Sequence, residues 1–419
     1  MTKTELHITE LGHRGDGIAL TAAGPVYVPG ALPGETVLAD VQDGRAAEYR
    51  LTKESPDRIT PQCRHFQLCG GCTVQHLDEG PYLAWKRDLV AKALTGRGID
   101  HPVQPVIAET TGSRRRAVFS AARAGRAILF GYHEAASNRL VDIAECPVLE
   151  PAIVRALIDL KRVSAILLPK KGEMRVTVLA TTAGLDVAID KADRGYAKKI
   201  ADVSMIAASA DWARLSVNGE VLLEVRPPAL DIGGTPVVPP PGGFVQATRR
   251  AEAALAELVF AGLGASKTVA DLFSGSGTFA LRIAKKAKVD AVEGDAAALK
   301  ALDAAIRRTQ GLKPVTLTRR DLFRSPLIKE DLDRFDAVVF DPPRAGAHAQ
   351  AVQLAASNVN IVVAVSCNPA TLARDLRILI DGGYALQTVT PVDQFLFSPH
   401  IEVVAVLTKE TGDGARRTG

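Results

Sequence analysis

The sequence predicts an α/β protein in which a doubly wound parallel sheet follows a central α+β domain and a small N-terminal β-barrel. After residue 240, short apolar strands such as "FDAVVFDPP" and "NIVVAVSC" alternate with helical segments. Strands that are apolar on both faces are typical of a parallel sheet covered by helices. Before residue 240, Gly/Pro turns interrupt the strand patterns, which is typical of antiparallel structure. A chain of 419 residues also exceeds the length of one ordinary core.

Four consecutive parts are predicted along the chain. Residues 1–57 have Gly/Pro turns between short β-type segments, as in "GPVYVPGALPGETVLADV", and predict the barrel. Residues 58–240 combine a helical segment, "PYLAWKRDLVAKALTGRG", with strand patterns that predict an antiparallel sheet broken by a helix near 150–163. The segment "GGTPVVPPPGG" predicts a connecting loop before the α/β part, residues 241–410. Residues 411–419 are predicted to form a frayed tail.

Composition limits the class of protein. Lys and Arg outnumber Asp and Glu by 51 to 47, so the net charge of +4 only weakly favours an acidic partner. The first residues, "MTKTELHITELGHRGDG", include acidic side chains and no apolar leader segment, and no later run is long enough to cross a bilayer. We therefore expect a cytoplasmic protein that binds no membrane, and we expect it to be a monomer.

The cysteine spacing favours metal ligation. Four of the five cysteines form a C-x5-C-x2-C set with one distant partner: Cys63, Cys69, Cys72 and Cys146. Thiolates spaced in this way can converge on one centre in a cytosolic protein. Four sulfur ligands without matched histidines suit either an iron–sulfur cluster or structural zinc, and the spacing does not decide between them.

The segment "DLFSGSGTFA", residues 271–280, predicts a nucleoside site. Gly275 and Gly277 lie in a turn between an apolar strand and a helix, where small residues let a ligand approach the backbone. Glu293, which ends the next strand, can accept hydrogen bonds from ribose hydroxyls. For the glycine pair alone, a tight turn without a ligand is the simpler explanation, and Glu293 is the residue that favours binding.

Three reactive side chains are predicted at the carboxyl edge of the parallel sheet. Asp341 ends the strand "FDAVVF", and Cys367 ends "NIVVAVS" just before an expected helix with Asn368 as N-cap. Glu402 opens the last strand and reaches the same edge if that strand is antiparallel to its neighbours. A helix end contributes about 1 kcal/mol, less than one pKa unit, so we expect the Cys367 thiol to stay largely protonated near neutral pH. A turn aspartate, a buried cysteine and a solvated glutamate are the simpler alternatives.

Basic residues cluster at 114–116, 169–175, 249–250 and 319–320. Such clusters are more often solvated surface than nucleic-acid contacts. Beside a small β-barrel they become candidate phosphate contacts.

Across nearly its whole length, the sequence resembles the S-adenosylmethionine-dependent RNA (uracil-C5)-methyltransferases, in particular the bacterial 23S rRNA branch with a TRAM domain and a 4Fe-4S cluster. "CRHFQLCGGC" is similar to the family's cluster-binding segment and "FVQ" to its cofactor-contacting segment. "DLFSGSGTF" resembles its first methyltransferase motif, "SCNPATLARD" its nucleophile motif and "HIE" its catalytic-base motif. The resemblance implies an OB-like TRAM barrel and a Rossmann-like class I methyltransferase sheet.

The resemblance also implies individual roles. Cys367 is the nucleophile, Glu402 the base and Asp341 a contact to the uracil. The cluster ligands are Cys63, Cys69, Cys72 and Cys146. The contacts to S-adenosylmethionine are Gln246, Phe273, Gly275, Thr278, Glu293, Asp321 and Asp341. Thr248, Ser274, Thr278 and Asp321 differ from the residues that are frequent in the family.

The implied reaction is methylation of one uridine at C5, by addition of Cys367 to C6, methyl transfer to C5 and proton removal by Glu402. The expected RNA is 23S rRNA, with a T-loop uridine of tRNA as the alternative. Methylation of an adenine amino group has no use for Cys367, and Arg344 stands where an aromatic side chain would stack. Cytosine C5 methylation would place the cysteine after the strand that ends at Asp341. The alternative from another class is a noncatalytic RNA-binding protein, which the presence of both Cys367 and Glu402 disfavours.

Overall fold

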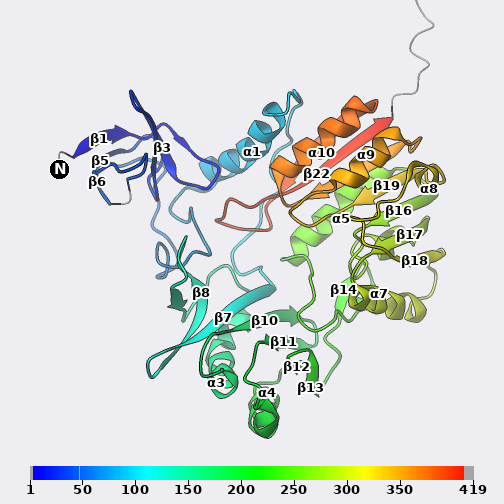
Figure 1. Ribbon diagram of the computed structural model, residues 1–419, viewed down its shortest axis with the longest axis horizontal. Helices are drawn as coiled ribbons and strands as arrows, with labels where there is room; N and C mark the ends of the chain where they lie inside the picture. The colour runs from blue at the N-terminus through cyan, green and yellow to red at the C-terminus, as the bar shows by residue number, and fades with distance from the viewer. Residues whose placement is uncertain (1–2, 47, 410–419) are drawn as a thin grey trace, which may run out of the picture.

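The computed structural model describes residues 3–46 and 48–409, so the predicted tail at 411–419 lies outside the described residues. Figure 1 shows three regions along the chain: N-terminal strands in blue, a central sheet in cyan and green, and a C-terminal sheet with its helices in green to red. None of the helices in the described ranges is long and apolar enough to span a membrane.

The N-terminal region consists of two three-stranded antiparallel sheets, β1-β5-β6 and β2-β3-β4. Side chains of both sheets, such as Leu6, Val28 and Val37, pack in one core, as expected for a small β-barrel. The strands are β1 Thr4–His7, β2 Glu10–Leu11, β3 Gly17–Thr21, β4 Gly24–Val28, β5 Thr36–Ala39 and β6 Tyr49–Lys53.

The central region is a seven-stranded sheet of order β13-β12-β11-β10-β7-β8-β9. The strands are β7 Arg116–Ala124, β8 Ala127–His133, β9 Leu140–Asp142, β10 Glu173–Thr181, β11 Gly184–Asp190, β12 Arg214–Val217 and β13 Glu220–Glu224. All neighbours are antiparallel, as predicted, except β11 and β12, because a helical crossover joins those two. The helices are α2 Pro151–Arg155, α3 Leu157–Leu167, η1 Tyr196–Lys199 and α4 Ile200–Ser209, so the helix predicted near 150–163 is in fact two.

The segment predicted as a connecting loop contains half of a hairpin. Strands β14 Leu230–Ile232 and β15 Thr235–Val237 pair across Gly233 and Gly234, which have φ values of 61° and 84°. Two residues with positive φ are what a two-residue hairpin turn requires. The prediction of a plain connection was wrong here, because a Gly-Gly pair is also a hairpin signal.

The C-terminal sheet has the order β18-β17-β16-β19-β20-β22-β21. The strands are β16 Thr268–Leu272, β17 Lys288–Glu293, β18 Val315–Arg319, β19 Ala337–Phe340, β20 Ile361–Ser366, β21 Tyr384–Val392 and β22 Glu402–Lys409. The first five strands in this order are parallel to one another, and β22 is antiparallel to both β20 and β21. The doubly wound sheet with an antiparallel last pair is therefore confirmed.

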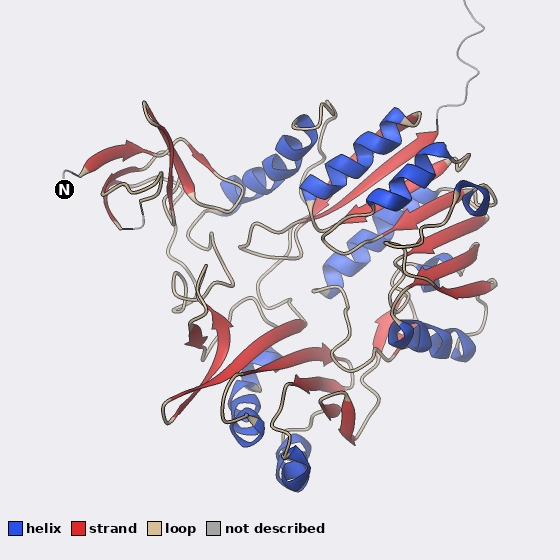
Figure 2. Cartoon of the chain, viewed as in Figure 1, coloured by secondary structure: helices blue, strands red, loops and turns tan. Residues whose placement is uncertain are grey.

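Helices cover both faces of this sheet (Figure 2). One face carries α5 Arg249–Leu263, α6 Ala280–Ile283 and α7 Ala296–Arg308, and the other carries α8 Lys329–Leu332, α9 His348–Ala356 and α10 Pro369–Asp381. Helix α1, Glu79–Thr95, lies beside α10 and adds Val90 and Leu94 to the same core. A helix from the predicted central domain thus packs on the C-terminal sheet, and the domain boundaries themselves stay a prediction.

Candidate active site

The sheet register brings the three predicted reactive residues to one edge. Strands β19 and β20 run parallel, so Asp341 and Cys367 follow their carboxyl ends at the same edge. Strand β22 runs the other way, and its pairing of Val403 with Ser366 places Glu402 beside that edge. The convergence that the sequence predicted only for an antiparallel last strand is therefore present in the structure.

Cys367 lies at the N-terminal end of α10. The side chain of Asn368 accepts a hydrogen bond from the backbone N–H of Ala370 at 3.1 Å, and Pro369 is the first helical residue, as predicted. Burial, followed by the negative charges of Glu402 and Asp341, raises the pKa of the Cys367 thiol to about 11, while Arg344 opposes the shift. The thiol is therefore protonated at rest, and its pKa is shifted upward rather than lowered by the helix end.

Two glutamine amides connect the two carboxylates. Gln246 donates from Nε2 to Oδ2 of Asp341 at 3.1 Å, and Gln394 donates from Nε2 to Oε1 of Glu402 at 2.8 Å. Gln394 also donates to Oε1 of Gln246 at 2.7 Å. Burial raises the pKa of both carboxyls, and the Asp341 charge raises that of Glu402 further. Both carboxyl groups therefore take up a proton at higher pH than an exposed carboxyl group does.

The sequence analysis did not single out Gln394. Its only signal is a polar pair, "DQ", directly after the apolar strand β21. The other member of that pair, Asp393, is fully buried and forms an ion pair of 2.8 Å with Lys86 of α1, and Tyr82 donates to the same carboxylate. These contacts from α1 fix the start of the loop 393–401, which leads into Glu402.

The predicted nucleoside turn has an open approach to the backbone. A side chain added at Gly275 would meet nothing within 4 Å, whereas one at Gly277 would come within 2.5 Å of Leu302. Gly277 is therefore required for packing, and Gly275 leaves room for a ligand. Glu293 accepts from the backbone N–H of Gly275 at 2.9 Å, which places its carboxylate at this turn.

Three other predicted cofactor residues, Phe273, Thr278 and Asp321, lie in this turn or beside the end of β17. Phe273 has a φ of 61°, a strained value for a non-glycine residue, and its ring centroid lies 5.4 Å from that of Phe323. Phe323 is half exposed and was not predicted. Asp321 is exposed and accepts from the backbone N–H of Phe323 at 3.0 Å. Thr278 is partly buried after Gly277.

A cleft of about 1040 Å³ runs from Cys367 to the N-terminal barrel. Arg344, Asn368 and His400 line it near the thiol, and α1 forms one wall. Its far end is lined by residues of β2, the β2–β3 turn and β4: Glu10, His13, Arg14 and Tyr27. The reactive edge therefore opens onto a groove shared by two regions of the chain.

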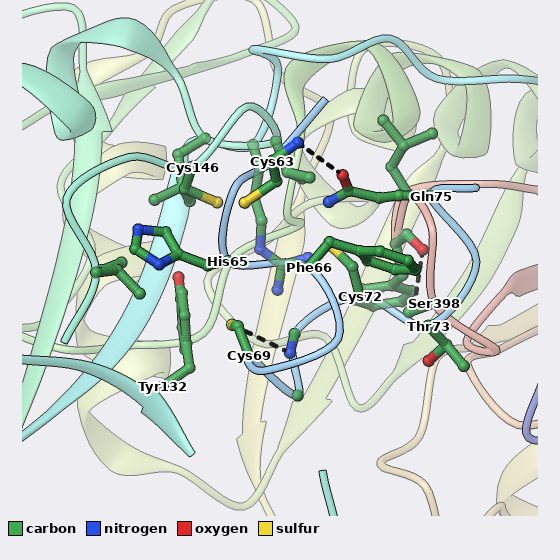
Figure 3. Close-up of a pocket in the computed structure, with 18 of the residues that line it drawn as sticks. Cys63, His65, Phe66, Cys69, Cys72, Thr73, Gln75, Tyr132, Cys146 and Ser398 are labelled. Atoms are coloured by element: carbon green, nitrogen blue, oxygen red, sulfur yellow. Dashed lines mark hydrogen bonds between the residues drawn. The ribbon is translucent and has the colours of Figure 1, made fainter. Parts of the chain in front are cut away.

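All four cysteines of the predicted ligand set line a second cavity, of about 450 Å³ (Figure 3). Cys63 donates its backbone N–H to Gln75 at 3.2 Å, and Cys69 accepts from Gly71 at 3.4 Å. Within 3–46 and 48–409, however, no three His, Cys, Asp or Glu side chains form a group that could hold a metal ion. The structure brings the four thiols to one cavity, and a bound cluster stays a prediction.

Part of the predicted phosphate-binding set is structural. Arg115 is 2% exposed and forms an ion pair with Glu252 at 2.5 Å. Arg116 donates to the carbonyl oxygens of Gly242 and Gly243, so it holds the segment before Gln246. The prediction of an RNA contact is wrong for Arg115, because an isolated triplet of arginines does not reveal which ones are buried.

Comparison with known proteins assigns the family. A family model described as tRNA (Uracil-5-)-methyltransferase matches residues 243–410. The 23S rRNA (uracil(1939)-C(5))-methyltransferase RlmD of Aliivibrio fischeri is 30% identical over 424 residues, which cover 96% of this chain and 95% of that protein. The chain belongs to the RNA (uracil-C5)-methyltransferase family. An uncharacterized RNA methyltransferase of Brucella suis is 50% identical to this methyltransferase over 97% of the chain and 98% of its own length.

The fold of the methyltransferase also matches a solved structure. The crystal structure of Pyrococcus abyssi tRNA (uracil-54, C5)-methyltransferase in complex with S-adenosyl-L-homocysteine has a TM-score of 0.77 and 24% identity. The structural match covers 96% of this chain and 99% of the Pyrococcus abyssi chain, so all three regions belong to the shared fold. The family match from residue 243 includes Gln246, Asp341, Cys367 and Glu402, and the four cavity cysteines precede it.

Proposed function

We propose that the methyltransferase transfers a methyl group from S-adenosylmethionine to C5 of one uridine in 23S rRNA. The main support for this proposal is that Cys367, Glu402 and Asp341 lie at one edge of the C-terminal sheet. From Cys367, a cleft extends to the N-terminal barrel. The choice of 23S rRNA is supported by the similarity to RlmD of Aliivibrio fischeri. The alternative RNA is tRNA, because the Pyrococcus abyssi enzyme of the same fold is a tRNA methyltransferase.

The residues around Gly275 fit S-adenosylmethionine. The open approach at Gly275 suits the methionine part, and the Glu293 carboxylate at the end of β17 suits ribose hydroxyls. Phe273, Phe323 and Asp321 suit an adenine, with aromatic faces and a polar edge. Gln246 and Thr278 complete the set. When bound, the cofactor supplies an electrophilic methyl group on a sulfonium.

The side chains at the sheet edge can activate the uracil. The Cys367 thiol first loses its proton to solvent, and the resulting thiolate adds to C6. The electrons of the C5–C6 bond move toward O4, which makes C5 nucleophilic. C5 then takes the methyl group. Glu402 removes the C5 proton, the bond from C6 to sulfur breaks, and the thiolate leaves. Asp341 is suited to orient the ring by a hydrogen bond, and the uridine must be unstacked for both ring faces to be reached.

The N-terminal barrel, residues 1–57, is proposed to be a TRAM-like RNA-binding domain. His13, Arg14 and Tyr27 line the end of the cleft that is remote from Cys367. Two basic or hydrogen-bonding side chains next to an aromatic ring suit a single-stranded segment flanking the target.

The test is transfer of label from tritiated methyl S-adenosylmethionine to protein-free 23S rRNA and, separately, to unmodified tRNA. We expect label in 23S rRNA that disappears with Cys367→Ala. Label in tRNA alone would keep the chemistry and overturn the RNA assignment. Label in neither RNA would favour the noncatalytic RNA-binding protein.

We further infer that Cys63, Cys69, Cys72 and Cys146 hold a 4Fe-4S cluster with a structural role. The support for this inference is that all four thiols line one cavity and that their C-x5-C-x2-C spacing with Cys146 suits such a cluster. The proposed reaction includes no electron-transfer step. We therefore infer that the cluster would stabilise the region between the N-terminal barrel and the central sheet.

Anaerobically purified protein should therefore be brown, with absorbance at about 400 nm. Cys72→Ser should lose this colour, because one of four thiolate ligands is removed. Cys367→Ala is the matched control and should keep it, since that cysteine lies outside the cavity. Colourless, zinc-containing wild-type protein would contradict the inference.

A further inference from the structure

We propose that Gln394 is a positioning residue that holds Glu402 by one carboxylate oxygen and leaves the other, Oε2, to accept the C5 proton. This inference rests on the proposed function, in which Glu402 is the base. It adds a residue to the site and assigns the proton to one atom of Glu402.

The orientation of the Gln394 amide is fixed by a group that can only donate. The backbone N–H of Ala247 donates to Oε1 of Gln394 at 2.8 Å, so that atom must be the oxygen. Both hydrogens on Nε2 then point to acceptors, Oε1 of Glu402 at 2.8 Å and Oε1 of Gln246 at 2.7 Å. The residue is 2% exposed, and a flipped amide would place two donors against each other at Ala247.

The two oxygens of Glu402 therefore have different environments. Oε1 accepts from Gln394, whereas Oε2 is buried and has no hydrogen-bond partner in the part of the chain that the structure describes. A buried carboxylate oxygen without a partner is a strong acceptor for a proton, because nothing else satisfies it. Protonation at Oε2 also leaves the bond to Gln394 intact, so the base does not have to move as it takes the proton.

The same amide connects the base to the other carboxylate. Since Gln394 donates to the oxygen of Gln246, the Nε2 of Gln246 is directed to Asp341, at 3.1 Å. One backbone N–H thus orients two amides and both acidic groups. A change at Gln394 should affect proton removal by Glu402 first, and the orientation of Asp341 through Gln246 second.

Two substitutions separate positioning from simple packing. Gln394→Met keeps the length of the side chain and removes both donors. Gln394→Glu keeps an acceptor for the Ala247 N–H, so it should fold, but it places an oxygen against Glu402. Gln387→Met is the matched control, because Gln387 lies on the same strand β21 and is exposed, with a bond to Thr408 at 2.9 Å.

The measurement is a single turnover on RNA that carries tritium at uridine C5, with carbon-labelled methyl cofactor. Methyl transfer to RNA precedes proton removal, and release of tritium reports the removal itself. In both Gln394 variants we expect the rate of tritium release to fall about tenfold further than the rate of methyl transfer. The reason is that loss of a hydrogen bond to a charged group changes a rate by roughly that factor. In Gln387→Met, the ratio of the rate of tritium release to the rate of methyl transfer should be the same as in wild type.

The pH profile gives a second readout. The hydrogen bond from Gln394 lowers the pKa of Glu402, so its loss raises that pKa and the base ionises only at higher pH. In Gln394→Met, the pH at which the rate of tritium release is half its maximum should therefore increase by about one pH unit. The charged and titratable groups facing Glu402 are Asp341, Cys367 and Arg344, which are unchanged in Gln394→Met. Gln394→Glu adds a carboxyl group of its own, so the pH profile is compared between wild type and Gln394→Met.

Two results would overturn the inference. One is a rate of tritium release equal to the rate of methyl transfer at every pH in both Gln394 variants. The other is an equal loss of methyl transfer and release with an unmoved pH profile, which indicates a structural role only. Glu402→Gln in the same assay separates the two proposals: unimpaired release by that variant would remove the base assignment itself.

Discussion

Cys367→Ala is expected to reduce RNA methylation by at least about 10⁴-fold, because the uracil C5 is not nucleophilic until a thiolate has added to C6. The variant should also form no covalent complex with RNA that contains 5-fluorouridine, since the sulfur that would make the bond is missing. Methyl transfer to the RNA and a denaturing gel measure the two effects.

The thiol environment adds a pH dependence to this expectation. Because the pKa of Cys367 is raised to about 11, the thiolate fraction of the free enzyme rises about tenfold per pH unit at neutral pH. Alkylation of Cys367 by iodoacetamide should therefore accelerate steadily between about pH 7 and pH 9. A plateau in that range would show a neighbour that lowers the pKa.

The controls for Cys367→Ala test the rest of the molecule. The variant should keep its thermal unfolding temperature and its affinity for S-adenosylmethionine, because Cys367 lies outside the Gly275 turn. Turnover near the wild-type rate in a variant with both properties intact would refute covalent catalysis.

Glu402→Gln is expected to stop after methyl transfer and to accumulate methylated RNA bound to the protein. The amide keeps the shape of the side chain and can still accept from Gln394, so the site should assemble, but it cannot take the C5 proton. Without that step the C6–S bond cannot break. We expect turnover to fall by at least about 10³-fold, with label from the methyl group migrating with protein on a denaturing gel.

Glu257→Gln is the matched control, because Glu257 is exposed on α5 and the same change removes the same charge. It should turn over normally and accumulate no adduct. Normal turnover by Glu402→Gln would assign proton removal to another group. Loss of activity without an adduct would place the defect before methyl transfer.

Local sequence patterns determined a large part of this protein. Apolar strands followed by Asp341 and Cys367 located the reactive edge, and Asn368 with Pro369 located the start of α10, because caps and strand ends are set by neighbouring residues. The antiparallel position of β22 could be stated only as a condition for Glu402 to join them.

Only the tertiary structure decided which groups touch across the chain. Lys86 forms an ion pair with Asp393, and Arg115 forms one with Glu252, each more than 100 residues away in the sequence. Gln394 is oriented by the backbone N–H of Ala247, a contact that no sequence pattern predicts. The shape of the cavity that gathers Cys146 with the earlier cysteines was decided in the same way. Sequence periodicity records which face of an element is buried, whereas the contacts of a buried polar side chain depend on how separate elements pack.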